Sequence, residues 1–563
     1  MTSYKIGAHV TEGVASGTSS VGTVSKRNIG ILGSFIRGVP TTPMKVSSLE
    51  EFNSIFGGQS ASYFGPAFVK SIFNEAGDAD VILYILRVND AGTAATGTIS
   101  IPSISGNITG TIKAAYQGNE DPGSWGNNIS VKFYSLGYRA SGRYRLEVTY
   151  GDTDEVYDYD NLADMQAAIN TRSSLIAITF SAGKVKPAEF VKITGTVSTT
   201  SGSNILKGTG TTFTNLKAGD ILYNNDTGDI IGTVLSITNA TELKLTKIVS
   251  GTASNITAAT GTYYSVSGVL SNGSDNERDI IDNDFKMFDG VDVQIITYTE
   301  GHTLENAILL NNYLNDRQDP IGVLCMPANS TTAVAKLWHD SLVQSGTSFL
   351  AVYNCWATVY DDNYNKILIP GTAPILGASY LRNAYVQGGG IHIPPGGTDG
   401  AFKNVIEITP SNLSQSDIDT FVQSCYVNVV CYDKNYGFYV ASSRAMSNNS
   451  LYMSIHIRLQ TSYYKRYLKE LMLPYTQKPN TPELKNAMLV DCRAFFKNEY
   501  ANGALERSLD FDTAYQGVCD ASNNPKTQDR KLVNIDCLYV PTECTEAIRL
   551  SLLRNDAILT ISE

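Results

Sequence analysis

The chain has 563 residues, which is too long for one ordinary domain, and we expect three or four domains. A net charge of −11 at pH 7 argues against general nucleic-acid binding by the whole chain. Apolar residues make up 42% of the sequence, which is enough for packed cores, whereas the charged content of only 17% favours β-rich surfaces that are buried against partners.

The N-terminus lacks the apolar stretch of a secretion signal, and no apolar run is long enough to cross a membrane. We therefore expect no direct membrane insertion. The eight cysteines are scattered and none forms a Cys-x-x-Cys pair. This pattern favours buried thiols in a protein that folds in a reducing cytoplasm.

The first 27 residues are rich in Gly, Ser and Thr, and little in them could pack alone. Four of them alternate as one extended strand would: Tyr4, Ile6, Ala8 and Val10. Since a single strand is not stable by itself, this segment is either disordered or pairs with something else.

An α/β pattern follows. Residues 28–35 and 80–88 are apolar runs that predict buried strands. Residues 47–57 and 65–77 predict helices, since each begins with a capping residue or an early Pro and ends at a Gly. The order strand, helix, helix, strand is typical of an α/β domain.

The same pattern resumes near residue 286. Strands are predicted over 288–298, 321–328 and 349–361. Amphipathic helices are predicted between them, over 303–317 and 332–345. The chain therefore leaves an α/β domain and later returns to complete it.

The intervening region has a different character. Residues 128–152 alternate as a hairpin would, and residues 161–170 predict one short helix. Residues 191–266 contain short β-segments separated by turn residues, which is typical of a small barrel or sandwich.

The C-terminal region begins near residue 385. It predicts two helices, near 449–473 and 481–501, followed by three apolar alternating segments at 532–540, 547–553 and 557–561. The last segment contains Ile558, Leu559 and Ile561. This order favours an α+β domain that ends in strands.

The predicted fold class is α/β and α+β multidomain: an α/β core with inserted β-rich domains, an α+β C-terminal domain and extended terminal arms. The expected boundaries are an N-terminal arm at 1–27, a discontinuous core at 28–94 and 286–384, an inserted α+β domain at 95–190 and 267–285, a small β-barrel or sandwich at 191–266, a C-terminal domain at 385–554 and a C-terminal arm at 555–563.

The sequence has few residue patterns that are typical of catalytic, metal or cofactor sites. The five histidines do not share metal-ligand spacing, and the Gly-rich run 208–212 lacks the Lys of a phosphate loop. The pair Asp361 and Asp362 favours a turn, because Asn-Tyr-Asn follows it. We therefore expect no catalytic residue, no metal site and no cofactor, and predict a structural protein rather than an enzyme.

One helix, through residues 455–471, carries an unusual charge pattern. Four basic residues fall on one side of it, opposite an aromatic and aliphatic face: Arg458, Lys465, Arg466 and Lys469. Two interpretations remain open. The basic side is either a solvated face or a contact strip for an acidic protein partner.

Several segments, taken in order, resemble the contractile tail sheath family. They are NIGILGSFIRGVPTTPMKVSSLEEFNSIFGG (28–58), GPAFVKSIFNEAGDADVILYILRV (65–88), FLAVYNCWATVYDDNYNKILIPGTAPILGASYLRN (349–383), GGIHIPPGG (389–397), YGFYVASSRAMS (436–447) and CDASNNP (519–525). The resemblance covers roughly residues 25–95 and 285–563. Each motif alone is weak, and their order and spacing carry the likeness.

The resemblance implies a sheath subunit that polymerises as hexameric rings, stacked helically around an inner tail tube protein, and contracts to drive that tube through a target cell envelope. It further implies baseplate and tail terminator proteins as partners, no nucleic acid, and a virion tail or injection-system particle assembled in the host cytoplasm. The terminal arms would add strands to neighbouring subunits, and the four basic residues would contact the tube.

Two other classes of protein fit the sequence less well. A β-rich tail fibre, glycan-binding protein or depolymerase would need a carboxylate pair in an aromatic cleft. An α/β enzyme with a doubly wound sheet would need a Gly-rich phosphate turn after its first strand, which this sequence lacks.

Overall fold

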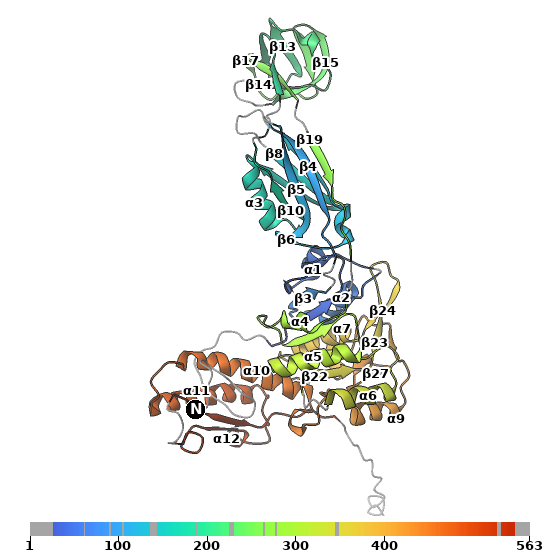
Figure 1. Ribbon diagram of the computed structural model, residues 1–563, viewed down its shortest axis with the longest axis vertical. Coiled ribbons are helices and arrows are strands. Elements are labelled where there is room, and N and C mark those ends of the chain that lie inside the picture. The colour runs from blue at the N-terminus through green and yellow to red at the C-terminus, as the bar shows by residue number, and fades with distance from the viewer. Residues whose placement is uncertain are drawn as a thin grey trace, which may run out of the picture.

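The computed structural model describes residues 26–546, apart from 61, 89–91, 104–105, 136–143, 184, 186–188, 225–229, 263–264, 276–277, 344–347 and 526–530. The predicted arm strands, with Tyr4, Ile6, Ala8, Val10, Ile558, Leu559 and Ile561, lie outside the described residues. Figure 1 shows an elongated molecule. An α/β core forms its base, the C-terminal helices extend to one side, and the inserted region rises from the core as a tower (residues 95–275).

The core is one seven-stranded sheet in the order β2-β3-β1-β20-β21-β22-β26. Every neighbouring pair is parallel except β2 and β3. The strands are β1 (Ile29–Gly33), β2 (Met44–Val46), β3 (Leu83–Arg87), β20 (Ile295–Tyr298), β21 (Ile321–Cys325), β22 (Leu350–Tyr353) and β26 (Val427–Asn428). The strands predicted near 28–35, 80–88, 288–298 and 321–328 are thereby confirmed.

Helices cover both faces of this sheet, and two apolar clusters fill the space between. One cluster contains Phe52 of α1 (Leu49–Phe56) and Ile72 of α2 (Gly65–Ala76). The other contains Leu310 of α5 (Leu304–Arg317) and Trp338 of α6 (Thr332–Leu342). Because both faces are covered, the central strands are continuously apolar.

Two predictions at the far edge of the core are wrong. The run 349–361 is not one strand: β22 ends at Tyr353, and β23 (Trp356–Tyr360) enters a separate sheet between β24 (Lys366–Pro370) and β25 (Glu407–Thr409). The core also does not end at residue 384, because β26 pairs with β22 in parallel. The chain turns at Asn354, whose N–H donates to the carbonyl oxygen of Asn428.

The lower part of the tower consists of two antiparallel sheets, β10-β5-β4 and β19-β7-β8-β9, around a shared apolar core. The predicted hairpin is formed by β7 and β8, and the predicted short helix is α3. The elements are β4 (Thr96–Ser103), β5 (Gly106–Tyr116), β6 (Asn119–Glu120), β7 (Ser130–Ser135), β8 (Tyr144–Tyr150), β9 (Thr153–Tyr159), α3 (Leu162–Arg172), β10 (Ile176–Phe180) and β19 (Ser265–Val269).

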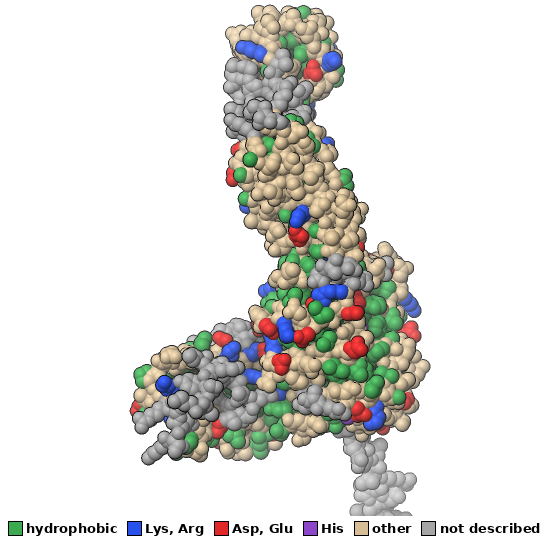
Figure 2. All heavy atoms as spheres, viewed as in Figure 1, with side chains coloured by type: hydrophobic (Ala, Val, Ile, Leu, Met, Phe, Trp, Pro, Cys, Tyr) green, Lys and Arg blue, Asp and Glu red, His purple; other side chains and the backbone are tan. Residues whose placement is uncertain are grey.

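The tip of the tower is an eight-stranded sheet with its own small core. Its strands are β11 (Glu189–Lys192), β12 (Thr196–Thr199), β13 (Ile205–Thr209), β14 (Ile221–Asn224), β15 (Ile230–Asn239), β16 (Glu242–Leu245), β17 (Ala253–Ile256) and β18 (Ala258–Thr262). On the face shown in Figure 2 the tower surface is mostly uncharged, whereas charged side chains gather on the base.

The C-terminal domain packs two long helices, α10 (Ile455–Met472) and α11 (Pro482–Ala501), against a sheet of two strands, β29 (Tyr515–Val518) and β30 (Asp536–Tyr539). An aromatic cluster joins them. The rings of Tyr467 and Phe495 stack at 4.3 Å, and those of Phe496 and Tyr515 at 4.4 Å. Among the described helices, none has both the length and the apolar character to span a membrane.

The remaining elements of the base lie in the core and in the C-terminal domain. They are α4 (Asp282–Lys286), α7 (Thr372–Ile375), a π-helical stretch (Leu376–Arg382), α8 (Asn383–Val386), α9 (Gln415–Asp419), β27 (Val430–Asp433), β28 (Gly437–Val440) and α12 (Phe511–Ala514). Arg382 fastens this region to α2, since its guanidinium donates to the carboxylate of the fully buried Glu75 at 3.1 Å.

Candidate functional site

Helix α10 carries the four basic residues singled out in the sequence, and one of them is buried. Arg458 has 0% of its surface exposed. Its guanidinium lies over the rings of Phe349 and Tyr452, at 4.6 and 4.3 Å, and donates to the hydroxyl of Ser348 at 3.3 Å. The expectation that Arg458 belongs to an exposed basic strip is therefore wrong, because the side of α10 opposite its aromatic face packs against the core.

Two further basic residues of α10 contact the same chain. The Lys465 ammonium donates to the carbonyl oxygen of Gln318 at 2.8 Å. The guanidinium of Arg466 pairs with the Asp319 carboxylate at 2.6 Å. Gln318 ends α5 in the left-handed conformation, so its carbonyl is one of the acceptors that a helix C-terminus leaves open.

This basic side of α10 therefore fastens the C-terminal domain to the end of α5. Neither interpretation of the sequence included an acidic partner within the same chain, which is Asp319. Of the four basic residues only Lys469 is exposed. It lies on α10 about one turn beyond the residues that contact α5.

The sheet of β29 and β30 is the second feature of the C-terminal domain. One face rests on α11 through Tyr515 and Tyr539. Among the described residues no third strand pairs with either outer edge. Leu538 and Val540 are 53% and 40% exposed. A sheet of only two strands is marginal alone, and its open edges are templates for added strands.

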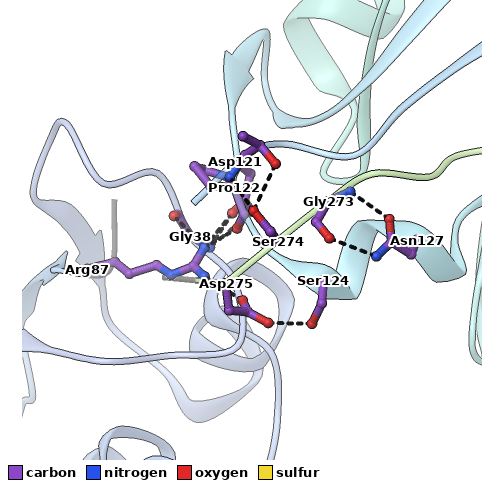
Figure 3. Close-up of polar contacts among 10 residues, drawn as sticks. Gly38, Arg87, Asp121, Pro122, Ser124, Asn127, Gly273, Ser274 and Asp275 are labelled. Carbon is purple, nitrogen blue, oxygen red and sulfur yellow. Dashed lines mark hydrogen bonds and ion pairs between the residues drawn. The ribbon is translucent and has the colours of Figure 1, made fainter. Parts of the chain in front are cut away.

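The joint between core and tower is the third feature, and Figure 3 shows it in detail. Arg87, at the end of β3, is buried and pairs with the buried Asp121 at 2.9 Å. The same nitrogen donates to the carbonyl oxygen of Pro122 at 2.6 Å. The Asp121 carboxylate in turn accepts the N–H of Gly38 at 2.9 Å. Burial raises the pKa of Asp121 to about 6, against the opposing effect of Arg87.

Other contacts complete this joint. Asp275 of the tower pairs with Arg87 at 3.7 Å. Within the tower, Asn127 exchanges two hydrogen bonds with the backbone of Gly273, at 2.9 and 2.8 Å, close to this pair. Arg37 of the core lies over the rings of Trp125 and Tyr150, at 5.2 and 5.7 Å. The tower is thus held on the core by the buried pair of Arg87 and Asp121 and by cation–π contacts, in addition to the covalent connections of the chain.

The described residues contain little that could perform chemistry. They include no group of three or more potential metal ligands. A groove of about 440 Å³ lies between α1, α2 and the hairpin of β23 and β24. Its two carboxylates are engaged: Asp361 accepts the N–H groups of Asn363 and Asn365 at 2.8 and 2.7 Å, as the predicted turn requires, and Asp362 pairs with Lys70.

His456 of α10 is buried beside the segment that leads to the C-terminus. Its Nε2 lies 3.2 Å from the carbonyl oxygen of Thr542. It lines a cavity of about 350 Å³ together with His392 and Glu543. Burial lowers the pKa of His456 to about 4.

The lowered pKa of His456 predicts acid sensitivity. Between pH 6.5 and 4 the unfolded chain binds up to one proton more than the folded chain at this residue. The contribution of neutral His456 to the free energy of unfolding is therefore complete above pH 6.5 and is lost as the pH falls. At pH 5 the loss is about 2 kcal/mol. We expect His456→Gln to flatten the decline of the urea unfolding midpoint between pH 7 and 5.

The control for this experiment is His339→Gln, since His339 lies on α6 and pairs with the exposed Asp340. It should leave the decline unchanged. His302, whose pKa burial also lowers to about 4, contributes its own share in both variants. Equal slopes for the wild type and His456→Gln would contradict the assignment.

The fold is similar to that of a tail sheath protein of known structure. A sheath tail protein from Listeria innocua, known from its crystal structure, matches with a TM-score of 0.51 and 10% identity, over 89% of this chain and 90% of that chain. The contracted sheath of an extracellular contractile injection system matches with 15% identity and a TM-score of 0.39, over 47% of this chain and 72% of that chain. The contracted helical sheath of the anti-feeding prophage matches with 14% identity and a TM-score of 0.40, over 50% of this chain and 79% of that chain.

No protein-family model matches the sequence, and no curated protein matches it either. The likeness is therefore one of structure. The chain has the fold of the contractile tail sheath proteins, as the order of its segments implied.

Proposed function

We propose that this chain is the sheath subunit of a contractile phage tail or injection-system particle. In this proposal it polymerises as hexameric rings stacked helically around an inner tube, and contraction of the stack drives the tube through a target cell envelope. The observation that carries the proposal is the fold of the Listeria sheath protein, matched over 89% of this chain. A sheath works by repacking its subunits, so the proposal includes no catalytic site and no cofactor.

The partners follow from the same proposal. Copies of the chain bind one another, the inner tube lies inside the rings, and baseplate and tail terminator proteins bind the two ends of the stack. The particle assembles in the host cytoplasm. The open edges of β29 and β30 support strand addition by the arms of neighbouring subunits.

Electron microscopy of the purified chain tests this function directly. Rings or hollow tubes with sixfold symmetry are expected, either alone or when the inner tube protein is added. Discrete particles without tubes, under all ionic strengths tried and with the inner tube protein present, would contradict the proposal. The alternative of a depolymerase predicts such particles together with release of reducing sugars from a surface glycan.

Contact with the inner tube is proposed for the end of α10. Lys469 is exposed there, whereas Lys465 and Arg466 are held by Gln318 and Asp319 and would contribute only by their remaining exposed surface. A solvated ion pair contributes only about 0–1 kcal/mol, but it is repeated in every subunit of each ring. Such pairs can hold a tube without forming a dry, permanent interface.

We therefore expect Lys469→Glu to weaken assembly on inner tubes by about threefold to tenfold in apparent affinity, since each altered pair changes by about 1 kcal/mol. Co-sedimentation with preformed tubes measures the effect. It should decline as salt rises, because the Debye length is only about 8 Å at physiological ionic strength.

The control is Lys207→Glu, the same charge change on an exposed residue of β13 in the tower tip. It should sediment like the wild type. If the two variants behave alike, α10 does not contact the tube.

A further inference from the structure

Two thiols of the C-terminal domain lie in contact. Cys492 is on α11 and is fully buried, and Cys537 is on β30 and is half-buried. Their Sγ atoms are 3.3 Å apart, at hydrogen-bond distance for sulfur. The Tyr515 hydroxyl lies 3.4 Å from the Cys537 sulfur. A disulfide needs the two sulfurs to approach to about 2.05 Å, so these two sulfurs are close to the distance at which they could bond.

We propose that Cys492 and Cys537 are a redox modification site, at which a small-molecule disulfide such as oxidised glutathione converts the two thiols into an intramolecular disulfide. The bond ties β30 to α11. It thereby anchors the sheet whose edges are open, and the segment that follows it towards residue 546. This role in the particle rests on the proposed function, whereas the reaction itself belongs to the single chain.

The chemistry proceeds in two exchanges. The Cys537 thiolate attacks one sulfur of oxidised glutathione, and one glutathione thiolate leaves. The Cys492 thiolate then attacks the Cys537 sulfur of the mixed disulfide, and the second glutathione leaves. Two protein thiols lose two electrons and two protons, and one glutathione disulfide gains them as two thiols.

The surroundings assign the first attack to Cys537. It is the more accessible of the two sulfurs, since Cys492 has 0% of its surface exposed. Hydrogen bonding with Cys492, and then with Tyr515, lowers the pKa of Cys537 despite its burial. The thiolate is the nucleophile, so both properties favour reaction at this residue.

A second pair of cysteines provides an internal comparison. Cys325 donates its S–H to the carbonyl oxygen of Cys355 at 2.6 Å, and both residues are buried in the core, where Cys325 ends β21 and Cys355 follows β22. With exposures of 0% and 1%, neither can meet a dissolved disulfide unless the core opens. We expect this pair to stay reduced under conditions that oxidise Cys492 and Cys537.

The test uses the purified full-length chain in native buffer with graded ratios of oxidised to reduced glutathione. Remaining thiols are alkylated, and peptides are mapped by mass spectrometry without reduction. The expected product is a single linkage between Cys492 and Cys537, with the count of alkylated thiols falling from eight to six. The unfolding equilibrium constant of the C-terminal domain should fall by about 30-fold or more on oxidation and recover with dithiothreitol.

Variants separate the roles of the two sulfurs. Cys492→Ala should accumulate glutathione on Cys537, and Cys537→Ala should leave Cys492 unmodified. Cys519→Ala, at a half-buried cysteine outside the pair, should form the bond as the wild type does.

The peptide map of the wild type decides the question even if a variant fails to fold. A stable glutathione adduct on Cys537 without the internal bond would overturn the proposal. So would a bond that appears only at denaturant concentrations that unfold the domain. The disulfide is measured on single chains, so failure of the bond to form does not contradict the sheath function. Likewise, absence of tubes in electron microscopy does not contradict formation of the disulfide.

Discussion

Arg87→Leu should destabilise the protein by about 3–5 kcal/mol, because removal of one partner leaves the other charge of a buried pair uncompensated. Asp121 has 0% of its surface exposed and would lose its ion-pair partner, while it keeps the hydrogen bond from the N–H of Gly38. The carbonyl oxygen of Pro122 would lose its donor as well. Urea unfolding followed by intrinsic fluorescence measures the loss, with Trp125 reporting on the joint.

The matched control for the joint is Arg145→Leu. Arg145 also pairs with an aspartate, Asp158, at 2.9 Å, but the two side chains are 39% and 30% exposed on the side of the tower. A solvated pair of this kind contributes about 0–1 kcal/mol. Equal losses for Arg87→Leu and Arg145→Leu would contradict the role assigned to the joint.

A double variant sharpens this experiment. Replacing both Arg87 and Asp121 with Leu removes the two charges together, and apolar replacement of a buried pair is often neutral. We expect the double variant to recover most of the stability lost by Arg87→Leu. A strictly additive loss would show that the two residues act independently.

Deletion of residues 2–20 should abolish tube formation while leaving a folded, soluble subunit. The segment carries the alternating residues Tyr4, Ile6, Ala8 and Val10, which in the proposed function add a strand to a neighbouring subunit. Electron microscopy scores tubes, and circular dichroism scores the fold. Normal tubes from the truncated chain would contradict the proposal that this segment links neighbouring subunits.

A pair of proline variants tests the same linkage within the intact chain. Proline has no N–H and therefore removes one ladder hydrogen bond from a strand. Ile6→Pro, inside the alternating segment, should reduce tube yield sharply. Ser19→Pro, in the Gly-rich stretch beyond it, should have little effect, and equal effects of the two would argue against strand addition.

Local patterns sufficed for much of the fold. Helix α1 begins where the sequence predicts it, since the Ser48 side chain accepts the N–H of Glu51 and Gly57 follows its last residue. The apolar runs of β1 and β21 predicted buried strands, and both are fully buried. These features depend on residues within a few positions of one another, so they can be predicted from the local sequence alone.

The candidate site was predicted less well, and α10 shows why. Helical periodicity placed Arg458 opposite the aromatic face of α10, and that placement is geometrically sound. Periodicity cannot say what packs against that side, and here it is Ser348 and Phe349 of the core. Arg466 likewise has its counter-ion in Asp319, 147 positions away along the chain.

The sequence by itself determined the mixed α/β, multidomain character of the fold, most of the strands and helices of the core, and the return of the chain to that core. Only the tertiary structure placed β26 beside β22, joined Arg87 to Asp121 and brought the Cys492 and Cys537 sulfurs into contact. The physical reason is the range of the interactions. Propensity, capping and periodicity act within a few residues, whereas these contacts join segments that are 34 or more positions apart and meet only when separate elements pack.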